Sequence, residues 1–567
     1  MTRTEEPPAD GVLGRNNSIS LSSVSVRENS DRADGMLTTG MTRRWCYPIL
    51  LLIVLFSAFV RFRLRDFPLE RDEGEYAYAG QLILQGIPPY ELAYNMKLPG
   101  TYAAYAVLMG AFGQTASGIH TGVLLVNAAI IILIYLLAGR LLGRSAGLVA
   151  AASYSLLSMN QTILGIAGHA EHFVLLPALA GILLLLKAVE ARRTGLLFWS
   201  GVLLGLSFLM KQPGVVFILF GGVYLLVLER KDAIDGRGLW TRIGAYSAGA
   251  ALPFVLTCLI LLKAVVFRKF WFWTFSYAAQ YVSNVNFDAG LQLFRFGFVR
   301  AVGAGLPIWV IAAVGLVLRS VHRAARDHAI FVGGFLLFSF MAVCPGFHFR
   351  EHYFILMLPA VSLLAGVAVT TATQMLSETR VAMRFVPVLC FIFACGFLVV
   401  RQRDFLFRMD PLTACRTVYG ENPFPEAVEV ANYIKSHSLS TDRIAVLGSE
   451  PEIYFYSQRH SATGHIYMYG LMEPQKYALQ MQQEMMQEID SAQPKFVVYV
   501  DVSSSWLAWP DSQRLIFDWA KNYLHERYEI TGVADILQHP AYRWGEDAKI
   551  PRPGSPMGLY VFKRKAL

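Results

Sequence analysis

The pattern of hydrophobic and polar positions divides this sequence into three parts. Residues 1–42 are rich in Ser, Asn, Asp and Arg and show no apolar period, so we expect a disordered cytoplasmic tail. Residues 43–400 contain long apolar runs separated by short polar connections. From about residue 401 the apolar runs become short and charged residues return. The pattern predicts an α-helical polytopic membrane domain over 43–400 and a separate domain over 401–567.

The apolar runs of the membrane domain have the length of membrane-spanning helices. They lie at about 45–62, 118–139, 146–164, 172–188, 195–210, 214–228, 243–265, 302–319, 329–344, 353–374 and 385–400. We therefore expect about eleven crossings. The run at 98–113 is apolar but short, and a crossing there would invert every later connection. We interpret it as a re-entrant or interfacial helix, next to a juxtamembrane helix over 75–85.

Basic residues predict the orientation of the domain. Lys and Arg gather at alternate connections, namely 43–44, 140–144, 187–193, 229–242, 319–326 and 380–384. The positive-inside rule places these connections in the cytoplasm. The intervening connections and the C-terminal domain then lie outside the cytoplasm, and the protein is expected in the cytoplasmic (inner) membrane.

The pattern of the C-terminal part predicts a small α/β domain. Four runs typical of strands, at 443–448, 495–500, 528–533 and 559–564, alternate with helical periods at 424–436 and around 512–528. Two aromatic segments, GSEPEIYFYSQR at 448–459 and HIYMYGLMEP at 465–474, are expected to contact the membrane domain.

Composition agrees with a membrane protein. The chain is 54% hydrophobic and only 16% charged, and a soluble protein of this size carries more charge. The net charge of +9 comes mostly from the short connections, so it indicates topology and no nucleic-acid partner. The six cysteines form no CxxC pair and support neither a disulfide framework nor a zinc site.

Candidate chemistry follows the first apolar run directly, in residues 61–99. Five acidic residues fall within ten positions there, bordered by Arg65, Arg71 and Lys97: they are Asp66, Glu70, Asp72, Glu73 and Glu75. Carboxylates this close to a membrane span are costly to desolvate, which favours a functional site. The alternative is a solvated loop held at the lipid headgroups.

These residues resemble the first outer loop of polytopic glycosyltransferases of the GT-C class. The resemblance is to the bacterial branch related to protein O-mannosyltransferases and aminoarabinose transferases of lipid A, and it covers most of 45–470. It is carried by Asp72-Glu73-Gly74-Glu75-Tyr76-Ala77, Gly86, Lys97-Leu98-Pro99, GRLLGRSAGLVAA at 139–151, Lys211, Arg350-Glu351-His352-Tyr353, Leu358-Pro359 and residues 424–462. The sequence departs from the family at Leu98, where a Pro is usual, and at Glu171, where an Asp often stands.

The resemblance implies an inverting glycosyltransferase. It would move a hexose or pentose from a polyprenyl-phosphate-linked donor to an envelope acceptor on the extracytoplasmic face, the acceptor being a hydroxyl of a lipid, polysaccharide or protein. Asp72 is the expected base that takes the acceptor proton. Glu73 and Glu171 are the further catalytic candidates; Glu73 would point elsewhere on a helix, and Glu171 can instead form a salt bridge or cap the helix that follows it.

Cationic residues at the same membrane face are expected to bind the donor phosphate. Lys211 follows a span, Arg350 lies in another outer connection, and Lys97 is a third option. The matched motif adds His352 and Tyr353 to the substrate-binding residues. The aromatic run at 270–281 is expected either to form an interfacial belt or to line a groove for the prenyl chain.

We expect no cofactor, although a divalent metal stays open as an alternative. His169, Glu171, His172, His348 and His352 are a conceivable ligand set, but their spacing fits no known pattern and favours histidines in a wet loop. Two other functions also stay open. A transporter or flippase would place ionisable groups in mid-span and show paired halves, and neither is seen. A non-catalytic scaffold of envelope assembly would use the outer domain as its binding module.

Overall fold

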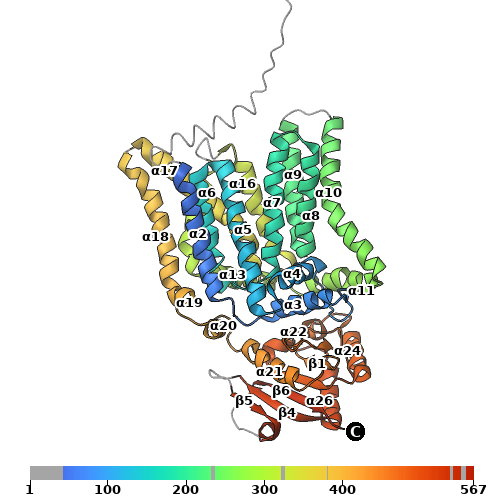
Figure 1. Cartoon of the computed structure of the whole chain (residues 1–567). Coiled ribbons are helices and arrows are strands. Elements are labelled where there is room, and N and C mark those ends of the chain that lie inside the picture. The colour runs from blue at the N-terminus through green and yellow to red at the C-terminus, as the bar shows by residue number, and fades with distance from the viewer. Residues whose placement is uncertain are drawn as a thin grey trace, which may run out of the picture.

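The computed structural model describes residues 43–231, 236–320, 326–379, 381–536, 541–550 and 557–566. The predicted disordered tail, 1–42, lies outside the described residues. A bundle of long helices forms one part of the molecule and a smaller α/β domain packs against one end of the bundle (Figure 1). The change in sequence texture at about residue 401 coincides with the end of the last bundle helix at Arg401.

Each of the eleven apolar runs is helical. The corresponding helices are α2 (Arg43–Arg63), α5 (Ala116–Leu142), α6 (Arg144–Leu157), α7 (Ala170–Glu190), α8 (Thr194–Met210), α9 (Val215–Lys231), α10 (Gly236–Lys263), α14 (Leu306–Leu318), α16 (Ala329–Val343), α17 (Leu358–Thr379) and α18 (Val386–Arg401). Among the described residues, eight helical stretches are long and apolar enough to cross a membrane, and α8 and α16 are shorter apolar helices. The predicted polytopic helical architecture is confirmed.

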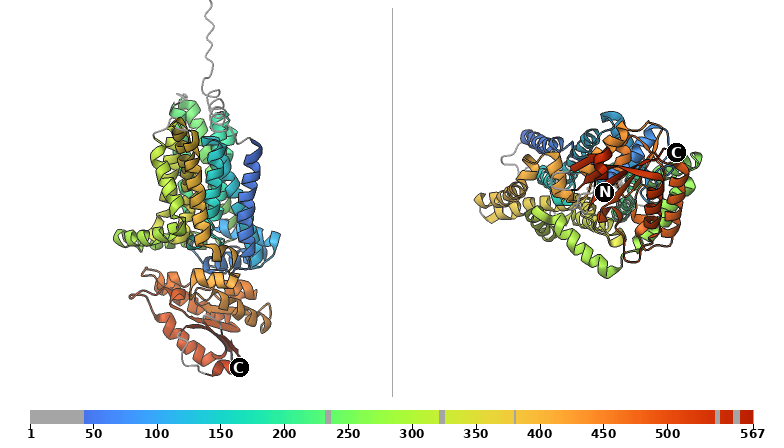
Figure 2. Two further views of the ribbon diagram at one scale, coloured as in Figure 1. Left: turned by 90° about the vertical axis from the view of Figure 1, so that its left-hand side faces the viewer. Right: turned by 90° about the horizontal axis from the view of Figure 1, so that it is seen from below.

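Shorter helices gather at the end of the bundle that faces the α/β domain (Figure 1). They are α3 (Arg71–Leu84), α4 (Pro99–Phe112), α11 (Phe267–Trp271), the π-helix η3 (Phe272–Tyr277), α12 (Ala278–Ser283) and α13 (Phe287–Val302). The helix α4 covers the short run 98–113 and lies beside α3, away from the middle of the bundle. Figure 2 shows α13 projecting sideways from the bundle.

The helix α3 begins four residues earlier than predicted because of its N-cap. The Glu70 carboxylate accepts a hydrogen bond from the Glu73 backbone N–H at 3.0 Å, and the Glu73 carboxylate accepts one from the Glu70 N–H at 3.4 Å. This reciprocal capping box fixes the helix start. The helix ends as predicted before Gly86, whose φ of +81° suits glycine. Asp72 consequently lies in the first helical turn.

The α/β domain contains one six-stranded sheet with the order β2-β1-β3-β6-β4-β5. Its strands are β1 (Arg443–Leu447), β2 (His460–Ser461), β3 (Phe496–Asp501), β4 (Tyr528–Asp535), β5 (Ala541–Trp544) and β6 (Gly558–Arg564). Parallel pairs join β1 to β2 and β3, and antiparallel pairs join β6 to β3 and β4, and β4 to β5. The four predicted strands are confirmed, and β2 and β5 were not predicted.

Helices pack on this sheet and connect it to the bundle. They are α19 (Arg403–Phe407), α20 (Pro411–Tyr419), α21 (Phe424–Ser436), α22 (Glu452–Ser457), α23 (Tyr469–Met472), α24 (Ala478–Ala492), α25 (Ser503–Trp506) and α26 (Leu515–Arg527). The predicted helical periods at 424–436 and around 512–528 correspond to α21 and α26. The prediction missed α24, although its buried Ala478, Met481, Met485 and Ile489 recur at helical spacing.

Arg71 connects α3 to the α/β domain. Its Nε donates to the Ser449 carbonyl at 2.6 Å, its guanidinium pairs with the Glu450 carboxylate at 2.8 Å, and Nη1 donates to the Tyr469 hydroxyl at 2.9 Å. Glu450 also accepts a hydrogen bond from Ser505 at 2.6 Å. Both aromatic segments that were expected to contact the membrane domain therefore do so.

Gly74 allows α3 to approach α22 closely, which yields a first prediction. A Cβ at Gly74 would lie 2.6 Å from the backbone nitrogen of Glu452, a distance that backbone atoms cannot tolerate. Gly74→Ala should therefore lower the free energy of unfolding by the roughly 1–3 kcal/mol typical of overpacking, and the purified protein should unfold at a lower temperature. The control is Gly139→Ala in α5, where a Cβ has no other atom within 4 Å. Equal unfolding temperatures for the two variants would contradict this account of the domain contact.

Candidate active site

A pocket lies where the helical bundle meets the α/β domain, and we call it the junction pocket. It encloses about 160 Å³. Its lining combines acidic, cationic and aromatic side chains: Asp72, Tyr94, Asn95, Lys97, Glu171, Lys211, Trp273, Tyr277, Tyr281, Arg350, Tyr353, Tyr467, Tyr469 and Glu473 are among them. Six of the eight residues predicted for the site, Asp72, Lys97, Glu171, Lys211, Arg350 and Tyr353, are thus brought together in one cavity.

Lys97 is shared by two carboxylates at the base of this pocket. Its ammonium lies 2.8 Å from Oδ1 of Asp72 and 2.9 Å from Oε2 of Glu75. Burial raises the pKa of the Asp72 carboxyl, but the charge of Lys97 and the nearby His352 outweigh burial and hold that pKa well below its usual value. The Glu75 carboxylate also accepts hydrogen bonds from the Tyr102 hydroxyl at 2.5 Å and the Asn95 amide at 2.7 Å.

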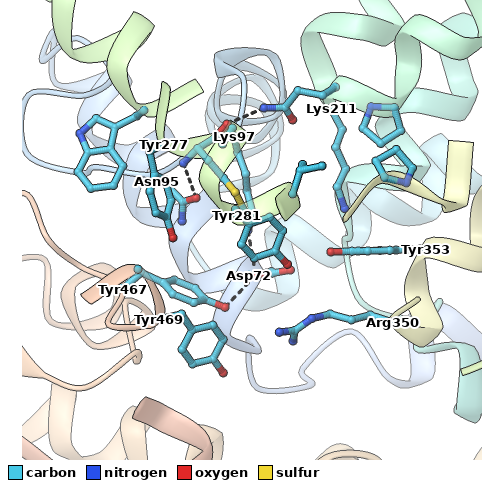
Figure 3. A pocket seen from close by; sticks show the side chains of 18 of the residues that line it. Asp72, Asn95, Lys97, Lys211, Tyr277, Tyr281, Arg350, Tyr353, Tyr467 and Tyr469 are labelled. Atoms are coloured by element: carbon cyan, nitrogen blue, oxygen red, sulfur yellow. Dashed lines mark hydrogen bonds and ion pairs between the residues drawn. The ribbon is translucent and has the colours of Figure 1, made fainter. Parts of the chain in front are cut away.

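Only one of the two carboxylate oxygens of Asp72 accepts hydrogen bonds from the described residues. The Tyr467 hydroxyl donates to Oδ1 at 3.2 Å, so Oδ1 is bound by both Lys97 and Tyr467. Oδ2 accepts no hydrogen bond from the described residues, and Nε2 of His352 lies 3.9 Å from it. The side chain of Asp72 is 18% exposed and faces the pocket, as Figure 3 shows. An ionised carboxylate with a free oxygen can accept a proton from a bound hydroxyl group.

Two further cations lie across the pocket from Lys97. Figure 3 shows Lys211, Tyr353 and Arg350 along one side, with Tyr467 and Tyr469 entering from the α/β domain. The Lys211 ammonium pairs with Glu171 at 2.5 Å and lies 4.2 Å from the centre of the Tyr353 ring. Arg350, in contrast, forms no ion pair with a carboxylate of the described residues, and its guanidinium lies 5.8 Å from the Tyr469 ring centre. It is therefore available to an anionic ligand.

Two predicted site residues do not line the pocket. Glu73 is fully buried; its carboxylate accepts a hydrogen bond from the Gly168 N–H at 2.5 Å and pairs with His120 at 2.9 Å. Glu73 thus joins α3 to α5 and to the connection before α7. His352 is buried behind Asp72, where its ring stacks on His169 with 4.2 Å between the ring centres.

The predicted alternative of a metal centre can be tested against this geometry. Asp72, His169 and His352 have ligand atoms within 4.8 Å of one another, and they form the one such group found among the described residues. A histidine binds a metal in the plane of its ring. The planes of His169 and His352 are only 9° apart and stacked, so their nitrogen lone pairs cannot meet at one ion. The arrangement does not fit a metal, and the chemistry below uses none.

Several residues in or next to the pocket were not predicted. Glu75 is fully buried and binds the pocket residue Lys97, and it belonged to the acidic stretch but was passed over in favour of Glu73. Tyr281 lies at the end of the aromatic run 270–281, and Tyr467, Tyr469 and Glu473 lie in the segment 465–474. Both segments were noticed for their aromatic content, but a single sequence does not show that residues about 200 and almost 400 positions after Asp72 line the same pocket.

The sharing of Lys97 yields a second prediction. Lys97→Met leaves Asp72 and Glu75 without their cation, and breaking a buried ion pair in this way costs about 3–5 kcal/mol. Because the folded pKa of Asp72 is depressed, the wild-type stabilisation is present at neutral pH and is lost as the pH falls. We therefore expect Lys97→Met to lower the unfolding temperature at neutral pH.

A double variant tests the same interaction. Glu75→Gln added to Lys97→Met removes one stranded charge, so the double variant should unfold at a higher temperature than Lys97→Met alone. Lys521→Met, an exposed position on α26, is the control and should have no effect. If the loss of stability in the double variant equals the sum of the losses caused by Lys97→Met and Glu75→Gln separately, then Lys97 and Glu75 do not interact.

Comparison with known proteins identifies the fold. The family described as "Dolichyl-phosphate-mannose-protein mannosyltransferase" matches residues 98–260. No curated protein matches the chain. The structure of ArnT from Cupriavidus metallidurans in the apo state is similar, with a TM-score of 0.56, 15% identity, and coverage of 92% of this chain and 98% of ArnT.

Two more solved structures share this similarity. ArnT from the same organism bound to undecaprenyl phosphate also gives a TM-score of 0.56, at 16% identity and with 92% and 98% of the two chains covered. The archaeal oligosaccharyltransferase AglB from Archaeoglobus fulgidus, in complex with an inhibitory peptide and a dolichol-phosphate, gives a TM-score of 0.53 at 11% identity, with 91% of this chain and 76% of AglB covered. The chain therefore has the fold of the polytopic GT-C class of glycosyltransferases, as the sequence resemblance predicted.

Proposed function

We propose that this protein is an inverting glycosyltransferase that uses a polyprenyl-phosphate-linked sugar as donor. Its acceptor is a hydroxyl group of an envelope lipid, polysaccharide or protein. One observation supports this most strongly: the junction pocket holds Asp72, with a free carboxylate oxygen, together with Arg350, which has no carboxylate partner among the described residues. A base and an available phosphate-binding cation in one cavity are what transfer from a phosphate-linked donor requires.

Arg350 and Lys211 are the proposed phosphate-binding residues. The guanidinium of Arg350 matches two phosphate oxygens at once, whereas Lys211 supplies a point charge. Glu171 is paired with Lys211 at 2.5 Å. We assign Glu171 to positioning this lysine, which leaves Asp72 as the base. Tyr353, whose ring lies beneath the Lys211 ammonium, limits where that charge can move.

The reaction is a single displacement. The acceptor oxygen attacks the anomeric carbon, the bond from that carbon to the phosphate oxygen breaks, and the proton of the acceptor passes to Oδ2 of Asp72. One displacement inverts the anomeric configuration, by analogy with inverting glycosidases. Polyprenyl phosphate leaves without needing a proton, because Arg350 and Lys211 stabilise its added charge.

The proposed donor and topology agree with further observations. The similar ArnT and AglB structures contain undecaprenyl phosphate and a dolichol-phosphate, respectively. In this chain Arg140, Arg144 and Lys187 share a groove at the far end of α5, about 40 Å from the pocket end by helix length. The positive-inside rule then supports an extracytoplasmic pocket and α/β domain in the inner membrane.

The role of Asp72 gives a third prediction. Asp72→Asn removes the proton acceptor and should lower transfer at least 10²-fold, within the roughly 10²–10⁴-fold range of general-base catalysis. Transfer is measured with purified protein, a labelled polyprenyl-phosphate sugar and an acceptor extract. The control is Asp66→Asn, an exposed acid of the same stretch whose side chain is 61% exposed, which should transfer at the wild-type rate.

Other functions predict different results in this experiment. A folded Asp72→Asn variant with wild-type transfer would refute the catalytic assignment. A transporter or flippase would move label across vesicles without changing its covalent form. A scaffold would show no transfer in the wild type either.

Phosphate binding gives a fourth prediction. Arg350→Gln and Lys211→Gln should each weaken binding of undecaprenyl phosphate by about 10–100-fold, since a hydrogen bond to a charged group contributes about 1.5–3 kcal/mol. Asp72→Asn should not weaken it. Arg268→Gln, an exposed cation at the same end of the bundle, is the control. Unchanged affinity in both pocket variants would place the phosphate elsewhere.

A further inference from the structure

The α/β domain forms one wall of the junction pocket. Tyr467, Tyr469 and Glu473 of the segment 465–474 line the cavity together with Trp273 and Tyr277 of the π-helix η3. The cations that line the pocket all come from the membrane domain. The pocket therefore has a cationic part, which suits a phosphate, and a second part that is aromatic and acidic.

Glu473 is the acidic group of this second part. It follows α23, and its carboxylate accepts a hydrogen bond from the Tyr277 hydroxyl at 2.8 Å. The residue is 8% exposed, and no Lys or Arg of the described residues forms an ion pair with it. Burial raises the pKa of Glu473 to about 7, against the opposing effects of the Tyr277 hydroxyl, the Arg350 charge and the Asn284 amide. A carboxyl group at the pocket wall with one hydrogen-bond partner can form further hydrogen bonds to a ligand.

We propose that Glu473 of the α/β domain and Tyr277 of the membrane domain bind hydroxyl groups of the transferred sugar, so that the α/β domain takes part in selecting the sugar while cations of the membrane domain bind the phosphate. This inference rests on the proposed function. A carboxyl group accepts hydrogen bonds from sugar hydroxyls, and a tyrosine hydroxyl can both donate and accept. The rings of Trp273 and Tyr467 add flat apolar surfaces on which the C–H faces of a sugar can pack.

Other ligand groups suit Glu473 less well. A phosphate would be repelled by its carboxylate, and the available cation for a phosphate is Arg350. A general acid is not needed there, because the leaving phosphate departs unprotonated. A purely structural role, in which the Glu473–Tyr277 bond only joins η3 to the α/β domain, would affect all ligands equally. An experiment that compares ligands with and without a sugar therefore distinguishes this structural role from sugar binding.

The test compares two kinds of ligand on the purified full chain. Dissociation constants are measured for undecaprenyl phosphate and for undecaprenyl phosphate that carries glucose, mannose or N-acetylglucosamine. The ratio of the two constants isolates the contribution of the sugar. For the sugar with the largest wild-type ratio, Glu473→Gln should reduce the ratio about tenfold, because it replaces one oxygen of the carboxyl group with an amide donor and so removes a hydrogen-bond acceptor. Binding of undecaprenyl phosphate itself should stay unchanged.

Control variants separate the possible outcomes. Tyr277→Phe removes one hydroxyl group and should lower the same ratio, which decides the matter if Glu473→Gln does not fold. Glu484→Gln replaces an acid of α24 that is bound to His465 outside the pocket, and should change neither constant.

Three results would overturn the inference. They are an unchanged ratio in Glu473→Gln and Tyr277→Phe, equal weakening of both kinds of ligand, and a wild type for which none of the three sugars changes the affinity. A wild type that binds no undecaprenyl phosphate would overturn the proposed function, and this inference with it.

Discussion

The structure depends on one buried ammonium group, that of Lys97, between the carboxylates of Asp72 and Glu75. Two acids and one cation leave an excess negative charge, which would be costly out of water without further donors. Those donors are the hydroxyls of Tyr102 and Tyr467 and the amide of Asn95, and they come from α4, the α/β domain and the connection between α3 and α4. The same cluster therefore orients Asp72 and holds three segments of the chain together.

The charges of the pocket also show how a base and a phosphate site can share one cavity. A free Asp72 carboxylate would repel an incoming phosphate. Lys97 offsets this repulsion because it binds the Oδ1 oxygen of Asp72, while Oδ2 stays free of hydrogen bonds from the described residues. Arg350 has no carboxylate partner among those residues and lies on the opposite side of the pocket, where the proposed function places the phosphate. The separation of these roles needs no metal ion in the proposed reaction.

Sequence reasoning succeeded where the signal was local and failed where it was not. Length and polarity alone located the eleven bundle helices, and alternation of apolar residues located four strands. Predicting the topology placed Asp72, Lys211 and Arg350 at one membrane face. Glu73 was chosen over Glu75 because it completes the Asp-Glu pair of the resembled family, although it was expected to point elsewhere on a helix than Asp72. With the capping box, the helix starts at Arg71, so Asp72 and Glu75 are three residues apart on one helical face while Glu73 points elsewhere.

The α/β domain is part of the site, because the residues on either side of Asp72 are bound to it. Arg71 is buried in a network with Ser449, Glu450 and Tyr469, and Gly74 packs directly on Glu452. Moving the domain away from the bundle would expose the Arg71–Glu450 pair, whose partners are 9% and 0% exposed, and would displace the first turn of α3. The proposed donor and acceptor would then enter an assembled pocket, so rotation of lining side chains is a more economical way to admit them than separation of the domains.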